Sequence, residues 1–149
     1  MRYDIVSDTH GHLSAELLRA LEGADVIVHA GDMCSTADAR RLERIAPLKL
    51  CKGNNDWGYD YGPFVGNVTH FFASGLRWQV CHYQERLDLE VCDVAICGHT
   101  HRPLLERDSR TGVLVMNPGS PSLPPGGGPT MGRIVAEDGR LLKAEIVGL

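Results

Sequence analysis

The segment YDIVSDTH (residues 3–10) starts with a short apolar run and ends in polar side chains that can bind a metal. Residues 3–6 are typical of a buried strand, and Asp8 and His10 follow it directly. Four further clusters repeat this arrangement: Gly31-Asp32, Gly53-Asn54-Asn55-Asp56, His82 and Gly98-His99-Thr100-His101. Ligands of open α/β sheets bind at the carboxyl ends of the strands, so we expect all five clusters to meet at one sheet edge.

Strand and helix patterns alternate in the first third of the chain, which indicates parallel strands with crossover helices. We expect strands at 3–6, 26–28 and 48–51, and helices at 13–21 and 37–45. Residues 53–66 lose the pattern and are expected to form a loop that borders the site. Further strands are expected at 68–73, 76–81, 94–97, 104–106, 113–116, 132–136 and 141–147, with a proline-rich surface loop at 118–129.

Size and composition favour one domain over residues 1–149, because 43% hydrophobic residues suffice for a core. The net charge of -4 argues against a duplex nucleic-acid binder, which needs clustered lysine and arginine. The five cysteines are odd in number and form no C-x-x-C pair, so neither disulfides nor a thiolate zinc site is indicated. No signal peptide and no apolar stretch of about 20 residues is present, which predicts a cytoplasmic protein that does not bind membranes.

The polar clusters together supply nitrogen and oxygen donors without a thiolate. The candidate metal ligands are Asp8, His10, Asp32, Asn54, His82, His99 and His101. A carboxylate at Asp32 can bridge two cations with its two oxygens. Such a donor set suits manganese, iron, zinc or nickel better than calcium. Singly, each cluster could be a polar turn or a strand end, whereas all five in one order would require a series of coincidences.

The order D-x-H, G-D, G-N-x-D, H and G-H-x-H, followed by Asn117-Pro118-Gly119-Ser120, resembles the calcineurin-like metallophosphoesterases, in particular their small bacterial and archaeal phosphodiesterases. The resemblance covers the chain from Asp8 to Ser120. It implies an α/β fold of four layers, an αββα sandwich, that carries two divalent metal ions, manganese first and iron, nickel or zinc as alternatives. The ions would lie about 3.5 to 4 Å apart.

The resemblance also implies roles for the individual residues. Asp8, His10 and His101 would bind the first metal, Asn54, His82 and His99 the second, and Asp32 would bridge both. A hydroxide between the metals would attack the phosphorus of a small phosphate ester. Catalysis would then depend on Asp32, Asn54 and His82, with Asp56 orienting Asn54 or the chain around it.

Two positions depart from the family pattern. The serine/threonine phosphatases of the family place a histidine at the position of Asn55, and an asparagine cannot donate a proton to a departing alkoxide in the same way. We therefore expect phosphodiesters, or esters with acidic leaving groups, to be better substrates than alkyl monoesters. Tyr83 replaces the usual glycine after His82, and the short segment 84–93 leaves little more than two helical turns before the next strand.

Other functions stay open at this point. The same fold can serve as a protein-binding scaffold, as in the retromer subunit, or host a phosphomonoesterase, a nucleotidase or a nuclease. His12 is a peripheral residue, a substrate contact or an acid, and His29 and His70 are expected to be structural or solvent-exposed. The sequence leaves the substrate, the native metals and homo-oligomerisation undecided.

Overall fold

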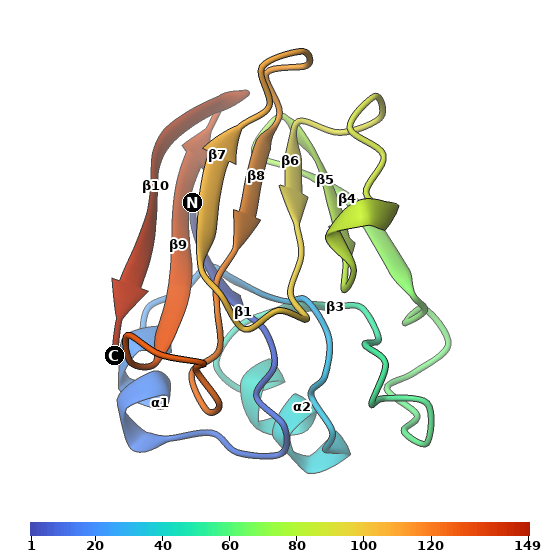
Figure 1. Ribbon diagram of the computed structural model, residues 1–149, viewed down its shortest axis with the longest axis vertical. Helices are drawn as coiled ribbons and strands as arrows, with labels where there is room; N and C mark the ends of the chain where they lie inside the picture. Colours follow the sequence, from blue (N-terminus) through green and yellow to red (C-terminus); the bar gives the residue numbers. More distant parts are fainter.

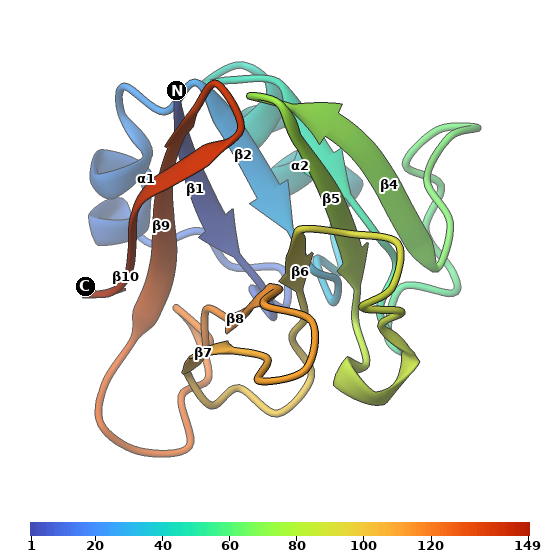
Figure 2. The same cartoon turned by 90° about the horizontal axis from the view of Figure 1, so that it is seen from above.

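Two five-stranded sheets pack face to face in the computed structural model, which describes residues 1–149 (Figure 1). The first sheet has the order β10-β9-β1-β2-β3 and the second has the order β4-β5-β6-β8-β7. The helices lie against the first sheet, on the face turned away from the second (Figure 2). The predicted αββα sandwich is confirmed.

Parallel strands form the half of the first sheet that carries polar clusters. These strands are β1 (Arg2–Val6), β2 (Val26–His29) and β3 (Leu48–Leu50), linked by α1 (Ala15–Leu21) and α2 (Thr36–Glu43). Each helix starts where a serine side chain, Ser14 or Ser35, accepts a backbone N–H of the first turn. These caps explain why α1 begins two residues later and α2 one residue earlier than the apolar periodicity predicted.

The second sheet begins with a hairpin at the positions that the sequence predicted. Its strands are β4 (Val68–Ala73) and β5 (Leu76–Cys81), and the turn places Ser74 and Gly75 at positive φ. β5 pairs in parallel with β6 (Val94–Ile96), and β6 pairs in parallel with β8 (Leu114–Asn117). β7 (Leu104–Arg107) is an antiparallel edge strand. The closing hairpin of β9 (Thr130–Glu137) and β10 (Arg140–Gly148) joins the first sheet through β1.

Two apolar cores hold these layers together. The core between the sheets includes Trp78, whose ring lies 4.4 Å from that of Tyr3 and 5.4 Å from that of Phe71. The second core joins α1 and α2 to the first sheet and includes Leu17 and Leu42, both fully buried. Because both sheets share one core, their loops are held in a fixed relation to one another.

The outer layer over the second sheet is thin. It consists of one short 3₁₀ helix, η1 (Gln84–Arg86), and the irregular chain that follows it. A small cluster that includes Cys92, Ala95 and Val115 packs beneath this chain. The sequence predicted this thin layer, because the segment 84–93 is too short for a full helix. Neither of the two α-helices has the length and apolarity needed to cross a bilayer.

Candidate metal centre

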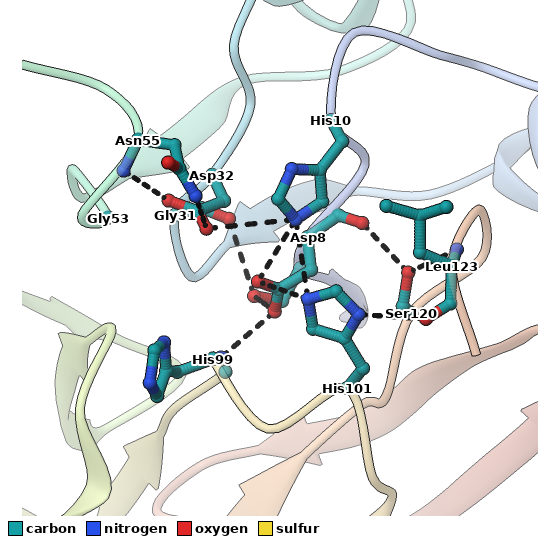
Figure 3. Close-up of polar contacts among 12 residues, drawn as sticks. Asp8, His10, Gly31, Asp32, Gly53, Asn55, His99, His101, Ser120 and Leu123 are labelled. Atoms are coloured by element: carbon teal, nitrogen blue, oxygen red, sulfur yellow. Dashed lines mark hydrogen bonds and ion pairs between the residues drawn. The ribbon is translucent and has the colours of Figure 1, made fainter. Parts of the chain in front are cut away.

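All seven candidate ligands come together at the carboxyl ends of the strands, and Figure 3 shows five of them: Asp8, His10, Asp32, His99 and His101. Asp8 and His10 follow β1, Asp32 follows β2 and Asn54 follows β3, whereas His82 follows β5 and His99 and His101 follow β6. The loops are joined by backbone hydrogen bonds. Asp8 N–H donates to the carbonyl of Gly31 at 2.9 Å, and His10 N–H donates to that of Asp32 at 3.0 Å. Both sheets therefore contribute to the site.

The first group of donors consists of Asp8, His10 and His101. His10 Nε2 lies 3.7 Å from Asp8 Oδ1, His101 Nε2 lies 3.3 Å from the same oxygen, and the two imidazole nitrogens are 3.3 Å apart. Asp8 Oδ1 is buried without a hydrogen-bond partner. A buried carboxylate oxygen is costly without a partner, so a cation between these three atoms fits the site.

The second group of donors consists of Asn54, His82 and His99. His82 Nε2 is 3.5 Å from Asp32 Oδ2 and 3.0 Å from Asn54 Oδ1, and His99 Nδ1 is 3.2 Å from the same amide oxygen. Asp32 Oδ2 is also 3.7 Å from His10 Nε2 of the first group. One carboxylate oxygen is thus within reach of both groups, which is the position of a bridging ligand.

Backbone carbonyls orient two of the imidazoles. His82 Nδ1 lies 2.7 Å from the carbonyl oxygen of Ala30, and His101 Nδ1 lies 2.7 Å from that of Leu123. A carbonyl can only accept, so both rings carry their proton on Nδ1 and turn the Nε2 lone pair toward the centre. The tautomer that metal binding requires is already set.

Asp32 is held by Asn55, a contact that the sequence did not reveal. Asn55 N–H donates to Asp32 Oδ1 at 2.9 Å, and Asn55 Nδ2 donates to Asp32 Oδ2 at 2.9 Å. Both residues belong to loops that follow neighbouring parallel strands, β2 and β3, and the side chain of Asn55 meets the carboxylate in Figure 3. The asparagine thus fixes the carboxylate that lies between the two groups.

Asp56 fixes the backbone of the same two loops. Its carboxylate accepts from the N–H groups of Asp32 (2.7 Å), Gly53 (2.8 Å) and Cys34 (2.9 Å) and from the hydroxyl of Tyr61 (2.8 Å). We expected Asp56 to orient Asn54 or the chain around it, and its bonds go to the chain. Tyr61, buried beneath the loop, is a supporting residue that sequence reasoning missed.

Asp8 is supported from three directions. Ser7 Oγ donates to Asp8 Oδ2 at 2.7 Å, His99 N–H donates to the same oxygen at 3.0 Å, and Ser120 Oγ donates to the Asp8 carbonyl at 2.8 Å. Ser7 was not identified as a supporting group from sequence, and Ser120 was noted only as part of the Asn117–Ser120 motif. The position of Ser7 between a buried strand and Asp8 is a signal that could have found it.

The backbone of the site is strained where the ligands sit. Asp8, His10, Asp32, His99 and His101 all have positive φ, between 50° and 72°. Non-glycine residues rarely adopt this conformation, and such strain is typical of functional sites. The surrounding hydrogen bonds hold these residues in conformations that a free loop would avoid.

Burial and hydrogen bonding shift the pKa values of three groups in the centre. Burial raises the pKa of Asp8, partly offset by the bond from Ser7. Burial also acts to raise the pKa of Asp32, but the contacts with His82 and Asn55 outweigh it and lower the pKa well below its usual range. For His82, burial acts to lower the pKa, and the contacts with Asp32 and the Ala30 carbonyl raise it overall. The centre thus favours the negative form of Asp32, whereas the burial of Asp8 disfavours its negative form.

The remaining histidines lie outside the donor groups. His29 is fully buried, with its Nε2 atom 3.0 Å from Thr9 Oγ1 and its Nδ1 atom accepting the Gly31 N–H, and burial lowers its pKa to about 4. His12 and His70 are exposed. Asn117, at the end of β8, supports the loop that carries His99, because its Nδ2 donates to the carbonyl of Gly98 at 2.9 Å.

Comparison with known proteins places this geometry in context. A family model described as a calcineurin-like phosphoesterase superfamily domain matches residues 1–139. Phosphodiesterase YfcE of Escherichia coli strain K12 is 30% identical, over 87% of this chain and 84% of its own. A structure reported for a novel archaeal phosphodiesterase superposes with a TM-score of 0.77 at 25% identity and covers 99% of this chain and 100% of its own.

The vacuolar protein sorting 29 protein of Cryptosporidium parvum shares the fold as well. Its structure superposes with a TM-score of 0.78, covers 98% of this chain and 96% of its own, and is 16% identical. At this identity the likeness concerns the fold alone.

Proposed function

The chain belongs to the calcineurin-like phosphoesterase superfamily, and from that premise we propose that it is a metal-dependent phosphodiesterase acting on small phosphate esters. One observation carries the proposal: Asp32 Oδ2 lies within 3.7 Å of an imidazole nitrogen from each of two donor groups. Relatives named as phosphodiesterases support the choice of reaction. The unpaired, buried Asp8 Oδ1 supports the requirement for metal.

The donor atoms suit two divalent cations. Asp8, His10 and His101 would hold the first, Asn54, His82 and His99 would hold the second, and Asp32 would contact both. Mixed nitrogen and oxygen donors are compatible with manganese, iron, nickel and zinc, and manganese is our first choice. When bound, the pair would lower the pKa of a water that attacks phosphorus and would offset the charge of the phosphoryl oxygens.

The protein's own residues prepare this site before substrate arrives. Asn55 and Asp56 fix the carboxylate and the backbone of Asp32, and the Ala30 and Leu123 carbonyls fix the imidazoles of His82 and His101. Such preorganisation places the charges where they are needed without rearrangement during the reaction. In our proposal Asp32, Asn54 and His82 act directly in catalysis, and Asp56 acts by positioning Asp32.

The leaving group is expected to be an acidic alcohol or a phenol. Asn55 occupies the position at which a histidine could donate a proton, and its backbone N–H and its side-chain Nδ2 both donate to Asp32. An alkoxide leaving without a proton is a poor leaving group. We therefore expect diesters and esters with acidic leaving groups to be hydrolysed faster than alkyl monoesters.

A non-catalytic scaffold is the second candidate, since a vacuolar protein sorting 29 protein has the same fold. The seven donors and their hydrogen-bonded supports favour the enzyme, because strained backbone at converging polar side chains is typical of active sites. We further propose that residues 1–149 act as one domain, since both sheets contribute donors. A cytoplasmic location suits the five free thiols.

Metal depletion followed by reloading tests the function. Protein stripped with a chelator would be loaded with manganese, iron, nickel or zinc and assayed on bis(p-nitrophenyl) phosphate beside p-nitrophenyl phosphate, which has the same leaving group. We expect activity only after reloading, with the diester favoured. Asp32→Asn should lower turnover about a hundredfold or more. Asp60→Asn, in the exposed loop after Asp56, is the matched control; near-normal turnover of the Asp32 variant would refute the bridging role.

A further inference from the structure

A pocket of about 360 Å³ opens directly beside the second donor group. Asn54 and His82 are among the residues that line it, together with Lys52, Trp57, Tyr83 and Arg86. Its size lies within the range of small-molecule sites. Because two of the proposed metal ligands belong to its wall, a substituent of any phosphate held at the centre can extend into this pocket.

The pocket is positively charged, although the whole protein carries a net charge of -4. Lys52 and Arg86 both line it, and no aspartate or glutamate does. The ion pairs that arginine and lysine residues form in this structure all involve other residues. Two cations without carboxylate partners at the wall of one pocket attract an anion.

Arg86 packs on Tyr83, whose ring contacts two of the proposed ligands. Its guanidinium lies over the ring of Tyr83 at 4.6 Å, and the ring of Tyr83 lies 4.6 Å from that of His99 and 5.4 Å from that of His82. A cation on an aromatic face is attracted to the ring. Tyr83, the residue that departs from the family pattern, thus fixes a positive charge next to the second donor group.

Two flat aromatic side chains, Trp57 and Tyr83, also line the pocket. Trp57 is 88% exposed and lines the pocket, and the ring of Tyr83 lies on its wall. Exposed indole faces are suited to stacking on planar rings. A substituent that carries a ring and ends in an anion therefore matches the pocket in both shape and charge.

We propose that this pocket selects phosphodiesters in which one of the two ester groups carries a second phosphate. A nucleoside-like ring system separates this second phosphate from the scissile phosphate. Lys52 and Arg86 contact the second phosphate, and Trp57 contacts the ring. This proposal rests on the proposed phosphodiesterase function and names its substrate class. Hydrogen bonds between charged partners are stronger than neutral ones, so the second phosphate should raise kcat/KM about tenfold.

Two p-nitrophenyl diesters of one nucleoside test the proposal with the manganese-loaded protein. The first is thymidine 3'-(p-nitrophenyl phosphate), and the second is the same compound with a 5'-phosphate added. We expect the 5'-phosphate to raise kcat/KM about tenfold, mainly through KM, and the preference to shrink at high ionic strength. Turnover of neither compound would refute the proposed function, whereas equal turnover of both would refute only the present inference.

Charge-removing variants identify the groups responsible. Arg86→Gln and Lys52→Gln should each reduce the ratio of kcat/KM between the two compounds by several-fold, and Tyr83→Leu should reduce it by releasing Arg86. Arg140→Gln is the matched control. Arg140 follows the Asp138-Gly139 turn, in which Gly139 N–H donates to the carbonyl of Ser74. Ser74 precedes β5 and His82 follows it, so the two ends of this strand are about 17 Å apart. An unchanged ratio in the Arg86 and Lys52 variants would refute the assignment of the pocket.

Discussion

At the scale of single residues, Asp56 determines the geometry of the centre without facing it. Its carboxylate accepts four hydrogen bonds, including those from Asp32 N–H and Gly53 N–H. Asp56→Asn would turn an amide donor toward N–H groups that already donate. We expect a loss of about 1–3 kcal/mol in unfolding free energy and a 10- to 100-fold loss, roughly, in metal affinity.

Urea unfolding and manganese titration of the Asp56 variant would measure both losses. Tyr61→Phe is the graded control, because it removes one of the four bonds and should cost about 1 kcal/mol with little change in metal affinity. Unchanged metal affinity in Asp56→Asn would show that the residue does not position the site.

His29 makes the stability of the metal-free protein sensitive to acid. Its folded-state pKa of about 4 lies below the value of 6.5 for an exposed histidine. Above the pKa of 6.5 the imidazole is neutral in both the folded and the unfolded state, and its full contribution to stability is present. Between about pH 6.5 and 4 the unfolded chain takes up a proton that the folded chain refuses, so stability falls by about 1.4 kcal/mol per pH unit.

The test compares the wild type with His29→Gln after chelation. From about pH 7 to about pH 5 the unfolding free energy of the wild type should fall about 2 kcal/mol further than that of the variant, because glutamine does not titrate. Parallel pH curves for the two proteins would contradict the buried, neutral state of His29.

Which residues the sequence could reveal depends on how each one acts. The seven donors stood out because polar side chains followed apolar runs at five places. The support of His101 by the Leu123 carbonyl could not be foreseen, since a backbone group leaves no residue-specific signal. Asn55 was noticed only as a departure from a family pattern, and its bonds to Asp32 required the spatial pairing of two loops.

At the scale of elements, local signals defined the strands and helices well. The hairpin of β4 and β5 was predicted to the residue because its two-residue turn is encoded locally. The order of strands within the second sheet was not predicted, because the parallel pairing of β5, β6 and β8 depends on contacts between distant segments. Local periodicity cannot specify such pairing.

The junction between the two sheets depends on a glycine. Gly98 ends the run from β6 and precedes His99, and a Cβ atom there would collide with Ser7 Oγ and come within 2.8 Å of Asp8 Oδ2. Gly98→Ala should therefore push the loop of His99 away from Asp8. We expect at least about a tenfold loss in activity and a stability loss of about 1–3 kcal/mol.

Activity assays with graded manganese and thermal unfolding would measure the effect of Gly98→Ala. Gly66→Ala is the matched control, since its added Cβ would meet no atom within 4 Å and the residue has no positive φ. Full activity of the Gly98 variant would show that the reaction does not require the loop of His99 to stay close to Asp8.

At the scale of the whole molecule, the proposed metals link the two sheets. Asp8 and Asp32 belong to the first sheet, and His82, His99 and His101 belong to the second. A ligand that binds only the folded state stabilises it by RT ln(1 + [L]/Kd), which is about 2.7 kcal/mol at a hundred times Kd. For a domain of this size the unfolding temperature should rise by roughly 5–10 °C.

Calorimetry of the chelator-treated protein, with and without manganese, would measure this rise. Asp32→Asn should abolish most of it, because that carboxylate faces both donor groups, whereas Asp60→Asn should retain it. Surface binding of manganese would instead give the same small shift in all three proteins. Such a result would show that manganese does not stabilise the protein by binding between the two sheets. The convergence of their loops would then not be explained by the cations that we propose.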